Sequence, residues 1–286
     1  MAGHVIAEHL RNRGHDVETV ARSTGTVPAT HVLDVRDTAQ LDRVLTAGAY
    51  DVVVSCVGLL IQACEQDPAD AALVNSYLPQ QVARLLSSSS TRLIHLSTDC
   101  VFSGAAGPYP EEAPYDGQRV YDRSKALGEV RNDKDLTVRM SIIGPELNRA
   151  GTGLFHWFSR QVGTVQGYTR AHWNGVTTIE LARAVDALAL APVTGLIHLV
   201  PEESTTKYAL LMKMNEVFAR GLTIEGVEAH AADKRLTCTR DDVPFQVRGY
   251  DSMLEDMLTW ILEHPAMYPH YQHLVDRRSD DVHPTL

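Results

Sequence analysis

Tyr121 and Lys125, which lie four residues apart, are the side chains of this sequence best suited to acid–base chemistry. If the segment from Val120 onward is helical, both side chains lie on one helix face with their Cβ atoms about 6 Å apart. A tyrosine has an ordinary pKa of about 10, and a nearby ammonium lowers that pKa by favouring the phenolate. We therefore predict that Tyr121 acts as a proton donor assisted by Lys125. The alternative is an exposed tyrosine beside a solvated lysine, because this spacing also arises by chance.

Two hydroxyl residues precede the tyrosine and lysine. Residues 91–96 are expected to form a buried strand, Ser97 and Thr98 follow at its end, and a loop rich in Gly and Pro leads to Tyr121. A hydroxyl at that strand end is able to hydrogen-bond the same oxygen that the tyrosine protonates. Thr98 is the predicted third catalytic residue, with Ser97 as the alternative.

Strands and helices alternate along the first half of the chain. The predicted helices are 3–13, 38–47, 67–86 and one from Val120, and the predicted strands are 16–21, 31–34, 51–57, 91–96 and 136–140. This alternation predicts an α/β fold with a doubly wound parallel sheet. Ligands of such sheets bind beyond the carboxyl ends of the strands.

The pattern changes after residue 142. Residues 151–175 are rich in Gly, aromatic and polar residues and are predicted to form a loop-rich cap. Thr177 and Glu180 form a capping box for a helix that ends at Leu190. A strand at 195–200 and helices at 207–220 and 252–263 follow. We predict a core of residues 1–142, to which 176–201 return, and a smaller C-terminal cap of residues 143–175 and 202–286.

Composition excludes several classes of protein. The chain has 286 residues, of which 44% are hydrophobic, enough for a sizeable core. A net charge of −10 opposes non-specific nucleic-acid binding. We expect a cytoplasmic protein without a membrane partner, because no apolar stretch is long enough to span a bilayer and no signal peptide is evident. No metal site is predicted, because the four cysteines lack metal-ligand spacing and His264, His270 and His273 lie in a polar tail.

One expected element is absent from the start of the sequence. A sheet that binds a dinucleotide begins with a strand and a glycine-rich turn, whose backbone N–H groups hold the pyrophosphate. This sequence begins on a helix, and Gly3 stands where the last glycine of that turn belongs. We predict that roughly ten residues precede Met1 in the native protein and supply the strand and the first two glycines.

Several segments in combination resemble the extended short-chain dehydrogenase/reductases and, among them, the dTDP-4-dehydrorhamnose reductase family. The segments are 65–68, 74–75, 97–99, 101–102, the Tyr121 and Lys125 pair with 128–129, 139–141, 195–199 and 205–206. The resemblance implies a Rossmann-like core, a nicotinamide cofactor and reduction of the 4-keto group of a nucleotide-linked 6-deoxyhexose. The sequence departs from the family at Cys100, where an aromatic residue is usual, and at 57–60, where small residues are usual.

The resemblance also implies a role for each catalytic residue. Tyr121 would protonate the alkoxide that forms when the ketone accepts hydride. Lys125 would lower the pKa of Tyr121 and hold the cofactor ribose, and Thr98 would hydrogen-bond the carbonyl oxygen.

Cofactor choice depends on Arg22, which follows the second predicted strand. An arginine there suits the 2′-phosphate of NADP, whereas an acidic residue would suit NAD. NADPH is the expected cofactor, with NADH as the alternative. Asp34 is expected near the adenine, and Gly58 and Asn75 would line the cofactor groove by resemblance. The alternatives are that Arg22 is a surface arginine, that Asp34 is a solvated carboxylate, and that Gly58 and Asn75 have only turn or capping roles.

Four residues are candidates for binding the substrate. Arg139 at a strand end would hold a phosphate or pair with a carboxylate. Trp173, Asn174 and Lys207 would contact the sugar or the pyrophosphate from the cap, and a packed tryptophan with an exposed lysine is the alternative. The expected partner is the nucleotide sugar, and a homodimer is the oligomer that we consider.

Two other functions stay open. One is an epimerase or dehydratase of the same superfamily, an option that the acidic Asp99 keeps open. The other is a non-catalytic regulatory subunit on the same fold, as in methionine adenosyltransferase by family analogy. The intact set of Thr98, Tyr121 and Lys125 counts against this last function.

Overall fold

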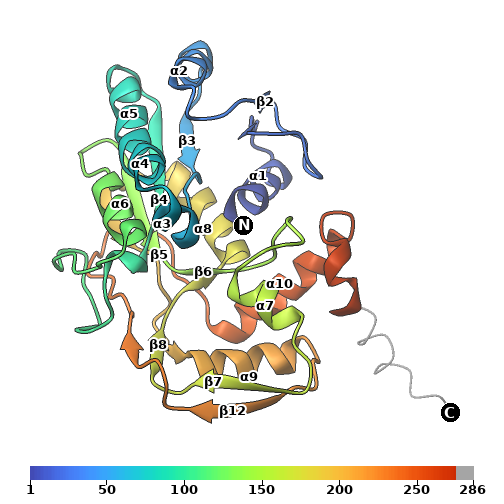
Figure 1. Cartoon of the computed structure of the whole chain (residues 1–286). Coiled ribbons are helices and arrows are strands. Elements are labelled where there is room, and N and C mark those ends of the chain that lie inside the picture. Colours follow the sequence, from blue (N-terminus) through green and yellow to red (C-terminus); the bar gives the residue numbers. More distant parts are fainter. Residues whose placement is uncertain (275–286) are drawn as a thin grey trace.

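The computed structural model describes residues 1–274, and its central element is a parallel sheet of four strands (Figure 1). Residues 275–286, which belong to the predicted cap, lie outside the described residues. The strand order is β10-β5-β4-β3. The bounds are β3 (Val52–Ser55), β4 (Arg92–Thr98), β5 (Leu136–Met140) and β10 (Gly195–His198). The predicted α/β fold with a parallel sheet is confirmed.

A second parallel pair is formed by β1 (Val20–Ala21) and β2 (His31–Val32), which is separate from the four-stranded sheet. The strands predicted at 16–21 and 31–34 are therefore too long, because only two residues of each are paired in the ladder. The predicted strand and glycine-rich turn ahead of Met1 stay a prediction.

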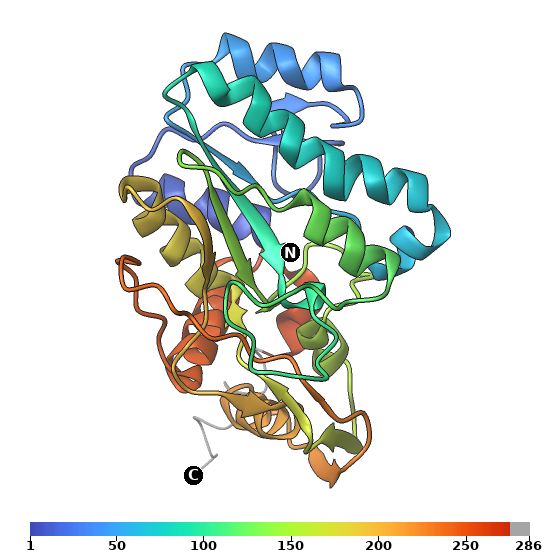
Figure 2. The same ribbon diagram turned by 90° about the vertical axis from the view of Figure 1, so that its left-hand side faces the viewer.

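Helices cover both faces of the sheet (Figure 2). On one face α1 packs against α8, and on the other face lie α2, α5 and α6. The bounds are α1 (Ala2–Asn12), α2 (Thr38–Ala47), α5 (Leu78–Leu85), α6 (Val120–Gly128) and α8 (Thr178–Leu190). Strand β4 explains this layering, since Leu93 packs in one apolar cluster with Val82 of α5, and Ile94 packs in the other with Val5 of α1.

The predicted helix 67–86 is divided into segments. It consists of α4 (Pro68–Ala71), a π-helical segment η1 (Ala72–Tyr77), α5 and a final turn η2 (Leu86–Ser88). A short helix that the sequence did not predict, α3 (Ile61–Gln66), precedes α4. π-Helical turns are frequent at functional sites, and this one carries Asn75.

The segment 151–175 is not loop-rich, so that prediction was wrong. It forms α7 (Leu154–Ser159), β7 (Thr164–Tyr168) and β8 (Ala171–Trp173). Gly167 is a close-contact position, because a Cβ there would lie 2.9 Å from the Cα of Tyr208.

The remaining elements complete the C-terminal half. Strand β12 pairs with β7, β8 lies between β11 and β13, and β6 pairs with β9. The bounds are β6 (Ile142–Ile143), β9 (Val176–Thr177), β11 (Thr205–Thr206), α9 (Lys207–Val217), β12 (Thr223–Val227), β13 (Ala232–Asp233), α10 (Tyr250–Glu263) and η4 (Pro269–Tyr271). Thr177 is the N-cap of α8, since its hydroxyl accepts a hydrogen bond from the Glu180 N–H at 3.2 Å. The predicted capping box is only half formed, because the Glu180 carboxylate accepts from Arg248 instead. The division into core and cap stays a prediction.

Within residues 1–274, none of the helices has both the length and the apolar character needed to cross a bilayer.

Candidate active site

The fold brings Thr98, Tyr121 and Lys125 together at the carboxyl end of β4. Thr98 is the last residue of β4 and caps the short turn η3 (Asp99–Val101) by accepting a hydrogen bond from the Cys100 N–H. Tyr121 and Lys125 lie one turn apart on α6, as predicted. The Lys125 ammonium donates a hydrogen bond to the Leu96 carbonyl oxygen at 2.8 Å, which ties the helix to the end of the strand.

The pKa of Tyr121 is raised above the ordinary value of a tyrosine. Burial is the largest cause and the charges of the nearby Cys100 and Asp99 add to it, whereas a hydrogen bond with the Thr98 hydroxyl opposes the rise. The predicted lowering of this pKa by Lys125 is therefore wrong, because loss of water around the phenol outweighs the nearby groups that favour the phenolate. A raised pKa keeps the phenol protonated at neutral pH.

Burial lowers the pKa of Lys125 to about 8, against the opposing charge of Glu129. The side chain is therefore mostly an ammonium at pH 7 and loses its charge in the mildly alkaline range. Lys125 lies in the protein interior, since it is only 5% exposed.

Asn75 joins the loop after β3 to the catalytic helix. Its side-chain oxygen accepts from the Leu59 N–H at 2.8 Å, and its amide nitrogen donates to the Leu59 carbonyl at 3.1 Å and to the Ser124 hydroxyl at 3.2 Å. A Cβ on Gly58 would lie 3.4 Å from the Asn75 side-chain oxygen. Asn75 and Gly58 thus lie side by side next to α6, and their contact with a cofactor stays a prediction.

Gly3 lies in α1 where the helix approaches the end of β3. A Cβ on Gly3 would lie 3.4 Å from Cys56, the residue after that strand. Arg22 is exposed just beyond β1, and its charge acts on both Asp34 and Asp70. Arg22 and Asp34 follow the carboxyl ends of β1 and β2, where the sequence placed the cofactor adenosine, and Asp70 belongs to α4.

Arg36 is a member of this group that the sequence did not single out. Its guanidinium donates to Asp70 at 2.6 and 2.7 Å and to Asp34 at 2.9 Å. Its backbone N–H and guanidinium hold the pKa of Asp34 below the usual range. A signal was present in the sequence, because Arg36 follows Asp34 by two residues.

The prediction that Arg139 holds a substrate phosphate is wrong. Its side chain has no exposed surface and pairs with Glu129, with Nη2 2.6 Å from the carboxylate. Another nitrogen, Nη1, lies 2.7 Å from His198 Nε2. The alternative considered from the sequence, pairing with a carboxylate, is the one observed.

Lys207, the first residue of α9, reaches the same region from the C-terminal half. Its ammonium lies 4.2 Å from the ring centroid of Trp173, within the range of a cation–π contact. Burial lowers the pKa of Lys207 to about 8, and the charge of Asp99 opposes this shift. The charge of Asp99, which follows Thr98, therefore acts on Lys207.

Asn174 has a different role from the predicted sugar contact. Its amide nitrogen donates to the Leu236 carbonyl at 2.7 Å, and its oxygen accepts from the Leu236 N–H at 2.9 Å. Because both polar atoms hold this backbone, we assign Asn174 to positioning of the segment at residue 236.

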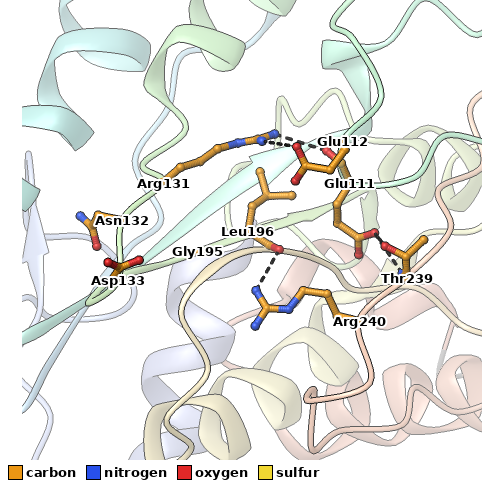
Figure 3. Close-up of a pocket in the computed structure, with 9 residues that line it drawn as sticks. All are labelled: Glu111, Glu112, Arg131, Asn132, Asp133, Gly195, Leu196, Thr239 and Arg240. Atoms are coloured by element: carbon orange, nitrogen blue, oxygen red, sulfur yellow. Dashed lines mark hydrogen bonds and ion pairs between the residues drawn. The ribbon is translucent and has the colours of Figure 1, made fainter.

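A separate cavity of about 370 Å³ lies along the edge strand β10 (Figure 3). Its charged lining is internally paired, since Arg131 lies 3.2 Å from Glu112 and Glu111 accepts from the Thr239 hydroxyl at 2.7 Å. The cavity is lined by Glu111, Glu112, Arg131, Asn132, Asp133, Gly195, Leu196, Thr239 and Arg240. None of the predicted site residues belongs to this lining.

In the part of the chain that the structure describes, no group of three or more His, Cys, Asp or Glu residues is arranged to hold a metal ion.

Comparison with known proteins gives the family. Residues 2–236 match the model of the RmlD substrate binding domain. A probable low-salt glycan biosynthesis reductase of Haloferax volcanii, Agl14, is 27% identical over 78% of this chain and 79% of its own length. The dTDP-4-dehydrorhamnose reductase of Mycobacterium tuberculosis is 39% identical over a matched segment that covers 34% of this chain and 33% of that protein.

A solved structure shares the fold. The dTDP-4-dehydrorhamnose reductase of Bacillus anthracis, crystallised with NADP, superposes with a TM-score of 0.77 at 17% identity, over 91% of this chain and 95% of that one. The predicted Rossmann-like architecture is confirmed, and the predicted class of enzyme, an NAD(P)-dependent sugar-nucleotide ketoreductase, agrees with the names of these relatives. The family match over most of the chain confirms the resemblance seen in the sequence: this chain belongs to the RmlD substrate binding domain family.

Proposed function

We propose that this chain reduces the 4-keto group of a nucleotide-linked 6-deoxyhexose with NADPH, with NADH as the alternative reductant. The observation that carries the proposal is the cluster of Thr98, Tyr121 and Lys125 at the carboxyl end of β4, where parallel α/β sheets bind their ligands. The relatives support it, because one is named a glycan biosynthesis reductase and another a dTDP-4-dehydrorhamnose reductase.

The residues at the carboxyl edge of the sheet fit a dinucleotide with a 2′-phosphate. The exposed Arg22 supplies a cation just beyond the end of β1, whereas the guanidinium of Arg36 is already paired with Asp34 and Asp70. Gly3 lies close to the residue after β3. A bound nicotinamide would supply the hydride.

The side chains of the site divide the remaining work. Tyr121 stays protonated at neutral pH and donates its proton to the oxygen that gains negative charge. Thr98 hydrogen-bonds the same oxygen, and Lys125 holds the ribose with its ammonium. Lys207 approaches the nucleotide sugar from the other side of the site, and Trp173, which is buried in the core, orients the Lys207 ammonium through the cation–π contact.

The test is a turnover assay with a panel of 4-keto-6-deoxy nucleotide sugars, each offered with NADPH and with NADH. Stoichiometric loss of reduced cofactor is expected. Tyr121→Phe should lower kcat by about 10² or more, because the phenol is the proton donor. Tyr77→Phe is the matched control, since Tyr77 is 50% exposed on η1 and should leave kcat unchanged.

Three outcomes would contradict the proposal. A loss below about threefold in Tyr121→Phe would remove the phenol from the chemistry. Turnover with bound NAD recycled and no net loss of NADPH would identify an epimerase or dehydratase. Stable co-purification with an unrelated enzyme and no turnover on any keto sugar would identify a regulatory subunit.

A further inference from the structure

We infer that Glu129, held by Arg139, is a positioning residue that fixes Lys125 and the end of β4 in the arrangement needed for proton transfer. The inference rests on the proposed function for its kinetic readout and on the contacts of Glu129 for its physical basis.

Glu129 lies on the catalytic face of α6. It is the residue at the C-terminal cap of the helix, four residues after Lys125 and eight after Tyr121. This spacing places the three side chains in one row along the helix.

The carboxylate of Glu129 is fully buried and has several donors. The Ser97 hydroxyl donates to it at 2.6 Å and the Tyr115 hydroxyl at 2.6 Å. Arg139 donates to both of its oxygens, from Nε at 2.9 Å and from Nη2 at 2.6 Å. A bidentate arginine gives this contact a defined geometry.

Two adjacent connections therefore join α6 to the end of β4. The Lys125 ammonium bonds the Leu96 carbonyl, and the Glu129 carboxylate bonds the hydroxyl of the next residue, Ser97. Thr98 follows directly. The register between the helix that carries the acid and the strand end that carries the hydroxyl is thus set by this pair of contacts.

Arg139 is itself held on several sides. Its guanidinium lies 4.9 Å from the ring centroid of Phe102 and 5.4 Å from that of Tyr115, and it contacts His198 as described. A buried ion pair of this kind contributes little net stability compared with apolar residues of the same volume, so fixed geometry is the better account of its presence.

The charge of Glu129, although paired with Arg139, also acts on the pKa of Lys125. The titratable groups that face Lys125 from neighbouring elements are Cys56, Cys64 and His95. Burial raises the pKa of Cys56 to about 12 and raises that of Cys64, and burial lowers the pKa of His95. All three are therefore neutral at pH 7.

The pKa of Glu129 lies below its usual range. Burial favours the neutral carboxyl group, but the hydrogen bonds and charge of Arg139 and the hydrogen bonds of Ser97 and Tyr115 more than offset it. Glu129 is thus ionised at neutral pH and opposes the loss of the Lys125 proton.

The experiment replaces the carboxylate with an amide of the same shape, Glu129→Gln. The titration of the Lys125 amine is followed by ¹⁵N NMR of lysine side chains, with Lys125→Met used to assign the signal. The midpoint is expected to fall by about one pH unit, and the alkaline limb of the kcat profile should move by the same amount.

Matched variants separate positioning from folding. Glu129→Gln with Arg139→Met removes both charges and avoids an unpaired buried arginine. Because loss of the Arg139 cation partly offsets loss of the Glu129 anion, a smaller fall in the Lys125 midpoint than in Glu129→Gln is expected. Glu228→Gln is the control, because its side chain is 80% exposed and pairs with Arg170, and it should change neither readout.

An unchanged Lys125 midpoint in a folded Glu129 variant, checked by circular dichroism, would overturn the inference. The NMR titration needs no substrate, so it judges the role of Glu129 even if no keto sugar is reduced. Absence of turnover in the unaltered chain would instead count against the proposed function.

Discussion

At the scale of single residues, burial decides the protonation of the candidate catalytic groups. It raises the pKa of Tyr121 and lowers that of Lys125 to about 8. The phenol of Tyr121 is therefore neutral at pH 7, and Lys125 is still mostly an ammonium although burial disfavours its charge. These are the forms that proton donation and ribose binding require. Spacing along the helix put these side chains together, but their depth in the fold set their chemistry.

The pH dependence of kcat follows from these shifts. Lys125 becomes neutral as the pH rises through about 8, so activity should be full below that value and fall above it. Steady-state rates between pH 6 and pH 10 check this. Lys207 also has a pKa of about 8, and Lys207→Met should raise KM but keep the alkaline limb. Loss of the alkaline limb in Lys207→Met would show that Lys207, and not Lys125, causes the fall in activity.

At the scale of elements, α6 is positioned by its contact with η1. A Cβ on Gly128 would lie only 1.9 Å from the Asn75 carbonyl oxygen. The absence of a side chain at this position lets the helix that carries Tyr121 and Lys125 approach the segment that carries Asn75.

Gly128→Ala should therefore force these elements apart. We expect a loss of unfolding free energy of about 1–3 kcal/mol, measured by urea denaturation, together with lower kcat. Gly25→Ala is the control, because a Cβ there meets nothing within 4 Å, and its effect should stay within about 0.5 kcal/mol. Equal stability of the two variants would show that the helix contact is not tight.

At the scale of the whole molecule, backbone contacts connect the loop after β4 to the C-terminal half. The Asp233 N–H donates to the Gly104 carbonyl, and Tyr109 exchanges backbone hydrogen bonds with Arg235 and Thr237. Asn174 holds the intervening Leu236 through both of its amide atoms. The loop that begins at the catalytic strand end is thus supported by a segment more than a hundred residues later.

Asn174→Ala should weaken this support. It leaves the buried N–H and carbonyl of Leu236 without their partners, which should cost about 1–3 kcal/mol and raise KM. Asn215→Ala is a matched control, because Asn215 holds Leu222 with the same pair of hydrogen bonds, at 3.0 and 2.9 Å, within the C-terminal half. It should cost similar stability in urea denaturation with KM unchanged. A KM that is the same in both variants would contradict a role for Asn174 in supporting the site.

Local pattern was sufficient for several elements of the fold. The helices at 38–47 and from Val120, and the strand at 136–140, have the predicted bounds, because each has its own periodicity and a clear start or stop. The catalytic group was predictable for the same reason, since a helix brings residues four apart together and a strand end presents the residues that follow it.

The rest was decided by tertiary contacts. Arg139 at a strand end has the sequence signature of a ligand-binding residue, and only the approach of Glu129 from α6 makes it a buried ion pair. Partners distant in sequence likewise decided the lengths of β1 and β2, the strands within 151–175 and the role of Asn174. Sequence by itself therefore determined which residues are the candidates for the chemistry, because their spacing is local. The tertiary structure decided their pKa values and their supports, because burial and long-range contacts exist only in the folded chain.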